Sequence, residues 1–246
     1  MKQQSLDMLW HGDQPWFRLD QADAVEWLLS LPPESVDLFV TDPAYESLEK
    51  HRKNGTTTRL AHSKASSNDW FDIFPNERFE QLLPAMHRAL RPDRHCYVMC
   101  DQETGFYLVE LNRRLGIFTF HKAIIWDKKR IGMGYHYRAR HEWILFFEKG
   151  KRKLNDLGVP DVLEFERVVG GYPTEKPVGL VETLIKQSTA EGEVVVDPFV
   201  GSGSAAEAAL RCARRFHGCD VSYQATQLAG QRVSRWVQGV AQGGER

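Results

Sequence analysis

Short runs of apolar, β-branched residues alternate along the chain with longer amphipathic stretches. The runs predict buried strands, and the stretches, in which apolar residues recur every three or four positions, predict helices. Pro92 is expected to stop one helix and Pro177 to open another. This alternation predicts an α/β fold with a doubly wound, mostly parallel sheet. Strands are expected at 35–41, 95–100, 118–126, 143–147, 193–196 and 216–219, and helices at 24–31, 77–90, 107–115, 177–185 and 205–210.

Three stretches fit no core element and are candidates for contacts outside the fold: 46–68, 128–140 and 149–172. No internal repeat is found. A chain of 246 residues with 42% hydrophobic residues has enough apolar side chains for one large core. We therefore expect a single domain over residues 1–246.

Charge and cysteine content narrow the classes of protein. The formal net charge is −1, so a surface for a polyanion must come from local clusters of Lys and Arg. No apolar run approaches the roughly 18 residues of a membrane span, and no signal-like block follows Met1, so we expect a cytoplasmic protein. The four cysteines form no CxxC pair, and we expect reduced, buried thiols and no metal site.

Two motifs carry most of the chemical information. Asp42-Pro43-Ala44-Tyr45 follows the strand at 35–41, and Asp197-Pro198-Phe199-Val200-Gly201-Ser202-Gly203-Ser204 connects the strand at 193–196 to the helix at 205–210. Both motifs therefore lie in turns that leave a strand at its carboxyl end. Open α/β sheets bind their ligands at that end of their strands, so both motifs are candidates for a binding site.

The glycine turn is compatible with more than one nucleotide cofactor. Gly201 to Ala206 match the pattern G-x-G-x-x-A, and Asp220 follows at the end of the next short strand, where an acid can bind two ribose hydroxyls. Both NAD and S-adenosylmethionine carry such a ribose. Only 26 residues remain after Asp220, too few for the other strands of a nucleotide-binding sheet. Those strands must come from the N-terminal part of the chain, so the order of the motifs is permuted.

A permuted nucleotide fold with an Asp-Pro-x-Tyr turn in its N-terminal half resembles the β class of S-adenosylmethionine-dependent amino-group DNA methyltransferases. The resemblance covers nearly the whole chain, and Ala22 and Ala44 depart from it, since the family usually has glycine and proline there. Ile125 to Lys128 and Arg138 to Leu145 also look like segments of the family's core. The main motifs follow the family's order: the turn at 41–45, a recognition segment near 149–172, Pro173-Thr174-Glu175-Lys176-Pro177, and the loop at 196–203.

The resemblance implies a catalytic role for Asp42, Pro43, Ala44 and Tyr45. The lone pair of an aromatic amine is delocalised into its ring, and acceptors on the two amine hydrogens favour localising that pair toward a methyl donor. The Asp42 carboxylate can supply one acceptor and the Pro43 carbonyl the other. Tyr45 offers a flat face to an extruded base, and such stacking is worth about 1–3 kcal/mol. Alone, the motif is equally an ordinary strand-ending turn; the glycine loop favours the catalytic interpretation.

The same resemblance implies a site for S-adenosylmethionine. Phe199, Gly201 and Gly203 correspond to the loop against the methionine part and the adenine, and Asp220 corresponds to the acid that binds the ribose. Asp23, just before a helix, corresponds to the residue near the cofactor's adenine amino group, with Asp13 as a weaker rival.

Three more polar residues are candidates for the amino-acid end of the cofactor. Thr174 and Lys176, at the start of a helix, are expected to meet the methionine carboxylate, although Thr174 is equally suited to cap that helix. Asp197 is expected to bind the cofactor's ammonium group rather than only cap its own turn.

Basic clusters predict contacts with double-stranded DNA. Between Lys50 and Lys64 basic residues occur with no acid, so we expect a mobile flap over 46–68 that DNA orders; the alternative is a solvated loop. Further clusters lie at 128–140 and 149–153. The recognition segment at 149–172 is short, so sequence specificity must be modest or shared with the flap and a partner subunit. The residues expected to contact nucleic acid are Lys50, Arg52, Lys53, Arg59, Lys128, Arg138 and Arg140.

Together these expectations describe a site-specific DNA methyltransferase that acts on the N6 amine of a flipped adenine. Adenine is favoured by Asp42, because cytosine-specific members of the family more often carry Ser there. The alternatives are methylation of cytosine N4 or of RNA adenine, an NAD-dependent oxidoreductase, and a non-catalytic nucleic-acid-binding module. A homodimer is expected from the family alone, and restriction, phage and regulatory roles stay open.

Overall fold

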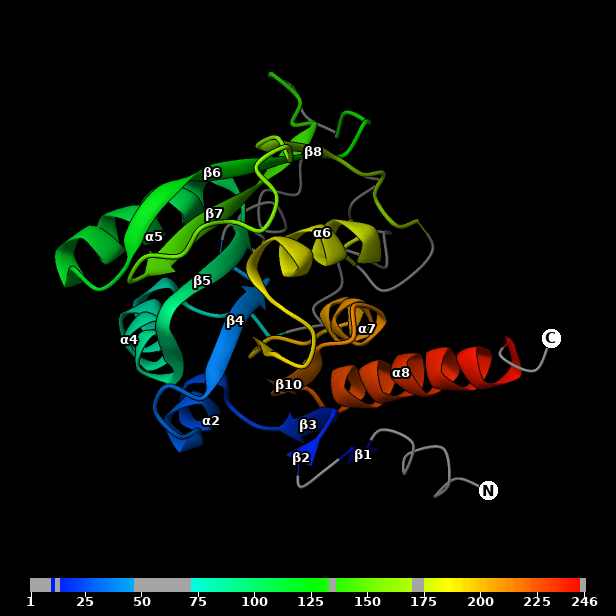
Figure 1. Cartoon of the computed structure of the whole chain (residues 1–246). Helices are drawn as coiled ribbons and strands as arrows, with labels where there is room; N and C mark the ends of the chain where they lie inside the picture. The colour runs from blue at the N-terminus through cyan, green and yellow to red at the C-terminus, as the bar shows by residue number, and fades with distance from the viewer. Residues whose placement is uncertain (1–9, 12–13, 47–71, 133–135, 170–174, 244–246) are drawn as a thin grey trace.

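Eight strands form one central sheet in the computed structural model, which describes residues 10–11, 14–46, 72–132, 136–169 and 175–243 (Figure 1). The N-terminal part supplies β3 (Phe17–Gln21), α2 (Ala24–Ser30), β4 (Val36–Thr41), the 3-10 turn η2 (Asn76–Arg78), α4 (Phe79–Ala89), β5 (Leu90–Cys100) and α5 (Gln102–Leu115). The rest supplies β6 (Thr119–Asp127), β7 (His141–Lys149), β8 (Val162–Glu164), α6 (Val178–Ser188), β9 (Val194–Asp197), α7 (Ser204–Arg211), β10 (Arg215–Asp220) and α8 (Tyr223–Gly243).

The strand order is β3-β10-β9-β4-β5-β7-β6-β8, and in the described sheet β7 alone runs against the other strands. A separate antiparallel pair joins β1 (Trp10–His11) to β2 (Gln14–Pro15). The C-terminal strands β9 and β10 lie between the N-terminal strands β3 and β4. This order confirms the predicted mostly parallel α/β sheet and its permuted connectivity.

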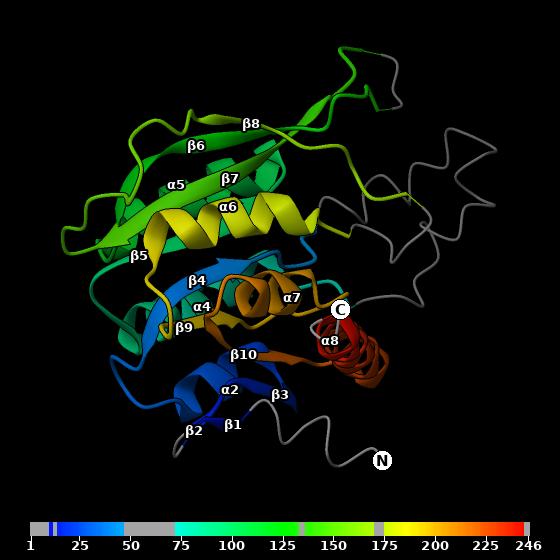
Figure 2. The same ribbon diagram turned by 45° about the vertical axis from the view of Figure 1, so that its right-hand side comes forward.

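Helices cover both faces of the sheet, as Figure 2 shows. One core layer packs α2, α4 and α5 against one face, with fully buried side chains such as Phe79 and Met86. The other layer packs α6, α7 and α8 against the opposite face around residues such as Leu180 and Phe216. The four cysteines are free and buried, as predicted. Because core side chains cover both faces of the sheet, the ligand site is expected at the edge where the strands end.

Several details of the sequence prediction were wrong. The helix before Pro92 ends at Ala89, and the strand expected from His95 begins at Leu90 and passes through Pro92. Proline is accommodated there because residues 91–93 are exposed, where a missing N–H costs little. Pro177 caps α6 rather than occupying its first turn. The stretch 149–172 contains β8, a short strand with buried Leu163 beside β6, so part of it belongs to the sheet.

Two wider expectations concern membranes and metals. Among the described helices, none combines the length and apolar character that a bilayer crossing requires. Within the described residues, no group of three or more His, Cys, Asp or Glu side chains is placed to hold a metal ion.

Candidate active site

A single pocket is lined by both sequence motifs. Its wall includes residues 42–45, at the carboxyl end of β4, and residues 197–202, at the carboxyl end of β9. Asp220, at the end of β10, lines the same pocket. Because β4, β9 and β10 are parallel neighbours, the turns that follow them meet at one edge of the sheet. The structure therefore brings together the turn expected to hold an amine and the loop expected to hold a cofactor.

The Asp-Pro-Ala-Tyr turn is fixed by a segment that follows it in the chain. Phe74 donates its backbone N–H to the carbonyl of Ala44 at 2.7 Å, and Tyr45 forms a parallel β-bridge with Phe74. Tyr45 is 8% exposed, and burial raises the pKa of its phenol, which stays neutral. The backbone contacts compensate in part for Ala44, the position at which the resembling family usually has a second proline.

The Asp42 carboxylate belongs to a network of alternating charges. Its Oδ2 forms an ion pair with Lys176 Nζ, which lies 3.5 Å from Glu142 Oε2. Glu142 Oε1 in turn accepts a hydrogen bond from Lys128 Nζ at 2.5 Å. Burial raises the pKa of Asp42, and the nearby Lys176 ammonium opposes this rise. The network thus contains two carboxylates and two ammonium groups, and three of its members, Asp42, Glu142 and Lys176, line the pocket.

Asp197 is the most deeply buried acid of the pocket. Its Oδ1 accepts hydrogen bonds from Thr41 Oγ1 at 2.8 Å and from the Phe199 backbone N–H at 2.9 Å. Burial raises the pKa of Asp197 to about 7, against the effect of those hydrogen bonds and with a further contribution from Asp42 and Asp220. Asp197 therefore both caps its turn and links the end of β9 to the end of β4.

The glycine loop places backbone atoms and one acid around the pocket. Gly203 has φ of +80°, and a side chain there would approach the Ala229 backbone of α8 to 2.8 Å, so both conformation and space require glycine. Asp220 Oδ2 accepts the Gly201 N–H and Oδ1 accepts the Ser222 N–H, each at 2.9 Å. Burial raises the pKa of Asp220. The glycine loop is thereby packed closely against α8 and tied to the end of β10.

The segment before α6 is tied to the glycine loop by an arginine of α8. Arg232 Nη2 binds Glu175 Oε1 at 2.6 Å, and its Nη1 donates to the Ser202 carbonyl at 3.1 Å. Its Nε donates to Glu207 Oε2 of α7 at 2.5 Å. This link fixes the backbone next to Lys176 and so determines where the Lys176 side chain enters the pocket.

Asp23 caps α2 and lines the pocket, as predicted for its position. It accepts the backbone N–H groups of Val25 and Glu26 and both terminal nitrogens of Arg78, the latter at 2.7 Å. The hydrogen bonds from Arg78 lower the pKa of Asp23. Arg78 also lies over the Phe74 ring at 5.0 Å, and that ring packs edge-on against Phe199 at 4.9 Å. An ionised acid and two aromatic rings therefore form one side of the pocket.

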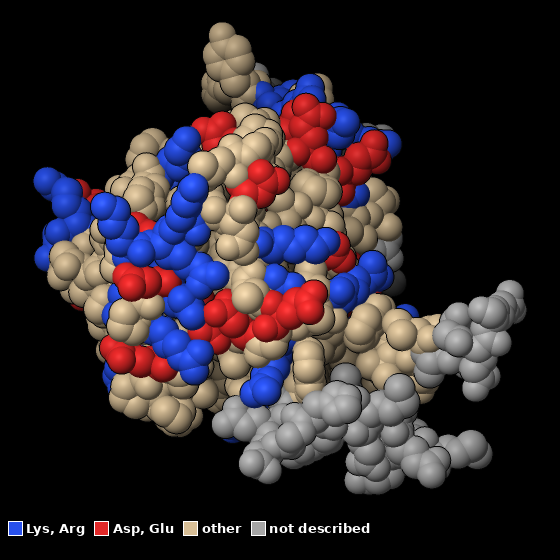
Figure 3. All heavy atoms as spheres, viewed as in Figure 1, with Lys and Arg blue, Asp and Glu red and all other residues tan. Residues whose placement is uncertain are grey.

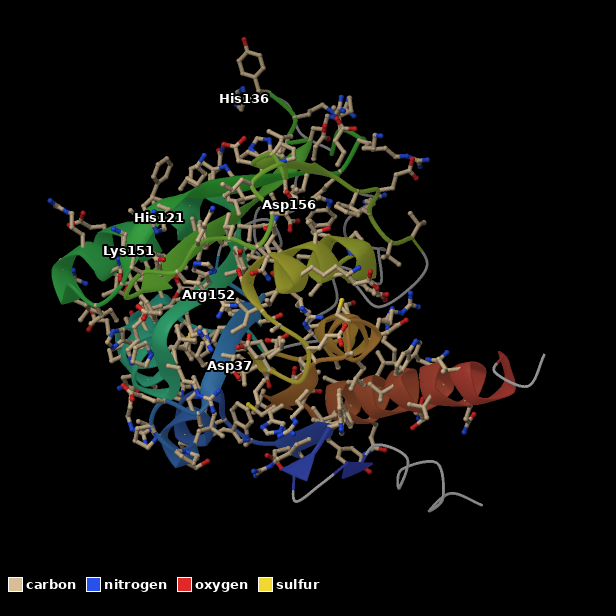
Figure 4. All side chains as sticks on the ribbon, in the orientation of Figure 1. Asp37, His121, His136, Lys151, Arg152 and Asp156 are labelled. Carbon is tan, nitrogen blue, oxygen red and sulfur yellow. The ribbon has the colours of Figure 1, made fainter. Side chains whose placement is uncertain are left out.

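The basic residues and clusters expected to contact DNA occupy three places in the described part of the chain. Arg140 pairs with Asp127 at 2.7 Å, and Arg138 donates to the Gly132 carbonyl at 2.6 Å, both on the connection between β6 and β7. Lys128 instead donates to Glu142 and so belongs to the charge network beside the pocket. The basic cluster at 149–153 lies at the end of the strands that is far from the pocket. Lys149 pairs with Arg94 near the start of β5. Figure 4 shows Lys151 and Arg152 in the same region.

Several predicted residues lie outside the described part of the chain. They are Asp13, Thr174, Lys50, Arg52, Lys53 and Arg59, together with most of the expected flap at 46–68. The roles proposed for all site residues from the sequence stay predictions.

Sequence reasoning missed Glu142, Phe74 and Arg78, which all line the pocket. Glu142 had a usable signal, since it is an acid beside a run of apolar strand residues, Trp143 to Phe147. A buried acid in a strand needs a charged partner, so it marks a functional or ion-paired position. No sequence pattern marks Phe74 and Arg78, because their position at the pocket depends on the tertiary fold.

Comparison with known proteins identifies the family. A family model described as DNA methylase, for N6 and N4 amino-group enzymes, matches residues 36–168 and 158–231. The chain belongs to this family of DNA methyltransferases. It is 30% identical over 232 residues to YubD of Escherichia coli strain K12, named as a methylase, covering 92% of this chain and 94% of YubD. It is 26% identical over 250 residues to the DNA adenine methyltransferase YhdJ of the same strain, covering 86% and 80%.

Solved structures agree on the fold. The DNA modification methylase TTHA0409 of Thermus thermophilus, in complex with S-adenosyl-L-methionine, has a TM-score of 0.66 and 25% identity, covering 91% of this chain and 95% of that one. The cytosine-N4-specific PvuII DNA methyltransferase has a TM-score of 0.68 at 14% identity, covering 93% and 94%, which shows the shared fold. The cofactor of this DNA methyltransferase is S-adenosylmethionine.

The pocket fits this cofactor in the chemistry of its donor groups. S-adenosylmethionine supplies an electrophilic methyl group and carries positive charge, a ribose and an adenine. The pocket offers the acids Asp197 and Asp220, the aromatic Phe199 and the glycine loop at one end of the sheet. An acid at the end of β10 is placed as in other nucleotide-binding sheets, where it binds ribose hydroxyls. The Asp42 to Tyr45 turn lines the same pocket.

Cofactor affinity is expected to depend on pH through Asp197. In the free protein its pKa is raised to about 7, with Asp42, Asp220 and Cys219 as its charged or titratable neighbours. A cofactor ammonium group bound at Asp197, as the sequence predicts, favours the ionised carboxylate, so binding below pH 7 is expected to release a proton. Calorimetry should show affinity falling by up to about tenfold per pH unit below 7 and little change above it.

The Asp197→Asn variant is the control for this dependence. It should bind the cofactor more weakly at pH 8 and lose most of the pH dependence. A wild-type affinity that is flat from pH 5.5 to 8 would show that Asp197 only caps its turn.

Proposed function

We propose that this DNA methyltransferase transfers the methyl group of S-adenosylmethionine to the N6 amine of an adenine flipped out of double-stranded DNA. The observation that carries the proposal is the Asp42 carboxylate in the shared pocket, where the Lys176 ion pair favours its ionised form. An ionised carboxylate accepts a hydrogen bond from an amine more strongly than a neutral group does. The name of the relative YhdJ, a DNA adenine methyltransferase, supports the same base.

Asp42 and Pro43 would act on the amine together. A carboxylate has about four acceptor sites over two oxygens, so the ion pair through Oδ2 leaves capacity for the substrate. The Pro43 carbonyl supplies the second acceptor, at a position fixed by the proline ring. Two acceptors on the amine hydrogens favour a localised nitrogen lone pair and stabilise the positive charge that develops as the methyl group arrives. The S–methyl bond of the cofactor would break in this step and S-adenosylhomocysteine would leave, and the nitrogen would return to neutrality by passing one proton through the Asp42 carboxylate to water.

DNA would approach along the edge of the sheet that carries the pocket. The β6–β7 connection extends from this edge, and Figure 4 shows His136 projecting from it. Two of its exposed cations are paired with acids, Arg140 with Asp127 and Lys129 with Glu164, and Figure 3 shows blue and red groups interspersed at the top of the molecule. Exposed ion pairs of this kind are worth little, so phosphate groups can replace the acids.

A direct assay tests the proposal. The protein is incubated with S-adenosylmethionine labelled in its methyl group and with duplex DNA, single-stranded DNA or RNA, and the nucleosides are then separated. The expected labelled product is N6-methyl-2′-deoxyadenosine from duplex DNA. Label in N4-methylcytosine would overturn the choice of base, and label in RNA alone would overturn the choice of polymer. A homodimer and a restriction role are proposed on the family resemblance only, and a cytoplasmic location stays an expectation from the sequence.

Tyr45 is expected to contribute stacking to the flipped base. Tyr45→Ala should weaken engagement of the base by about 1–3 kcal/mol, whereas Tyr45→Phe should keep most of it. Fluorescence of 2-aminopurine at the target position reports extrusion of the base independently of methyl transfer. If Tyr45→Phe is as impaired as Tyr45→Ala, the hydroxyl rather than the ring face is what matters.

A further inference from the structure

The charge network on the pocket wall joins residues from four parts of the chain. Asp42 follows β4, Glu142 lies in β7, Lys128 follows β6, and Lys176 precedes α6. The signs alternate from Lys128 to Glu142, from Glu142 to Lys176, and from Lys176 to Asp42. Asp42, Glu142 and Lys176 line the pocket. Asp42 is the last member of this network. It is also the first residue of the turn proposed to receive the base.

A buried tryptophan holds the two cations in place. Lys128 Nζ and Lys176 Nζ lie 5.3 and 5.9 Å from the centre of the Trp126 ring. Trp126 is 2% exposed, and its indole N–H donates to the Phe165 carbonyl at 2.8 Å, which fixes the ring plane. A cation over an aromatic face is attracted by the electron density of the ring, and more strongly where it is shielded from water, as Lys176 is. Both ammonium groups are therefore positioned from one side by Trp126 and from the other by carboxylates.

The balance of charges determines the state of each group. Burial opposes the charge of Lys176, but the carboxylates of Asp42 and Glu142 outweigh it and raise the pKa of Lys176. Burial likewise opposes the charge of Glu142, but Lys176 and Lys128 lower its pKa. Lys176 therefore stays charged at neutral pH and does not act as a base. For Asp42, burial and Glu142 favour the protonated form, and Lys176 is the main group opposing them.

We propose that Lys176 is a positioning residue, which holds the Asp42 carboxylate ionised and oriented toward the target amine, while Glu142, anchored by Lys128, holds Lys176. This inference rests on the proposed function of the pocket, and it gives Lys176 and Lys128 roles that differ from those expected from the sequence. Lys176 acts through Asp42 rather than on the cofactor, and Lys128 acts inside the protein rather than on DNA.

The Lys176→Met variant tests the inference, with single-turnover methyl transfer measured from pH 6 to pH 9. Without the cation, a larger share of Asp42 is protonated at neutral pH. The rate at pH 7 should fall about 10- to 100-fold, as for the loss of a charge-assisted hydrogen bond, and the deficit should shrink as pH rises. Cofactor affinity, measured by calorimetry, should stay within about threefold of wild type. A cofactor affinity that falls as far as the rate would overturn the inference.

Two further variants separate positioning from a general loss of structure. Lys176→Arg keeps the cation and should keep the wild-type pH profile. Adding Glu142→Gln to Lys176→Met removes the acid that repels the Asp42 carboxylate, so the double variant should be faster at pH 7 than Lys176→Met alone. Lys186→Met is the matched control, because Lys186 lies exposed in the last turn of α6 and pairs there with Glu182 at 3.5 Å. It should leave the pH profile unchanged.

A titration separates this inference from the proposed function. The Asp42 carboxyl carbon, labelled with carbon-13 and assigned by comparison with Asp42→Asn, reports its own protonation without substrate. The charged and titratable groups around it are Lys176, Glu142, Lys128, Asp197, Tyr45 and Cys100. In Lys176→Met its midpoint should rise by about one pH unit or more. An unchanged midpoint would overturn the inference, whereas a wild-type protein that transfers no methyl group to DNA would overturn only the proposed function.

Discussion

Replacing Asp42 with alanine is expected to lower the rate of methyl transfer by about 10²- to 10³-fold, the effect of removing one preorganised polar group from a reacting centre. The carboxylate lies at the end of β4 and lines the pocket, and it pairs with Lys176 rather than with the glycine loop. Its loss should therefore affect the substrate amine and leave cofactor affinity nearly unchanged. Single-turnover kinetics and calorimetry on the same preparation measure the two quantities separately.

The Asp42→Asn variant refines this result. Asparagine keeps one acceptor oxygen and the shape of the side chain but lacks the charge, so its rate should fall between those of wild type and Asp42→Ala. Thermal unfolding of each variant excludes a loss of fold as the cause. A fully active Asp42→Ala enzyme would remove Asp42 from the mechanism.

The general architecture and the meeting of the two motifs could be predicted from the sequence. Val36 to Thr41 and Val194 to Val196 are short β-branched runs, each followed by a turn, and such runs are typical of buried parallel strands. A parallel sheet places the turns that follow its strands at one edge. Thr41 and Asp197 confirm this closeness, since the Thr41 hydroxyl donates to the Asp197 carboxylate at 2.8 Å.

The direction of β7 could not be predicted from the sequence. This direction decides whether Glu142 reaches the charge network. The pattern from His141 to Lys149 predicts a buried strand whichever way it runs. Because β7 is antiparallel to β5, its first residues lie at the carboxyl edge, and Glu142 reaches the pocket. Lys149, at the other end of β7, is carried away from it. A parallel β7 would have exchanged these two positions.

The role of Lys176 could also not be predicted from its neighbours in the sequence. Its place before α6 predicts contact with an anionic ligand, since helix N-termini attract negative charge. The structure adds a carboxylate of the protein itself, because β4 runs beside β9 and ends next to the segment that precedes α6. That contact joins residues 134 positions apart in the sequence. No spacing rule connects them.

The second large effect is expected at the other end of β4, where replacing Asp37 with alanine should lower the free energy of unfolding by about 3 kcal/mol. Asp37 is 1% exposed, and its oxygens accept from Arg91 at 2.6 Å, Arg94 at 3.1 Å and the Val194 backbone N–H at 2.9 Å. Alanine would leave these donors without their acceptor. Partial exposure of the two arginines, 45% and 20%, keeps the expected loss at the lower end for a buried ion pair.

Thermal unfolding measures this loss as a fall in Tm of about 6–12 °C for a chain of this size. Asp161→Ala is the matched control, because the Asp161 carboxylate pairs with Lys122 at 2.9 Å on an exposed edge and its removal should leave Tm nearly unchanged. If Asp37→Ala has the same Tm as the control, water replaces the carboxylate without a loss of stability.

At a temperature where it remains folded, the Asp37 variant should transfer methyl groups at the wild-type rate, because Asp37 lies at the amino end of β4 (Figure 4), away from the pocket. Asp42→Ala should show the opposite pattern, so the two carboxylates of one strand separate stability from chemistry.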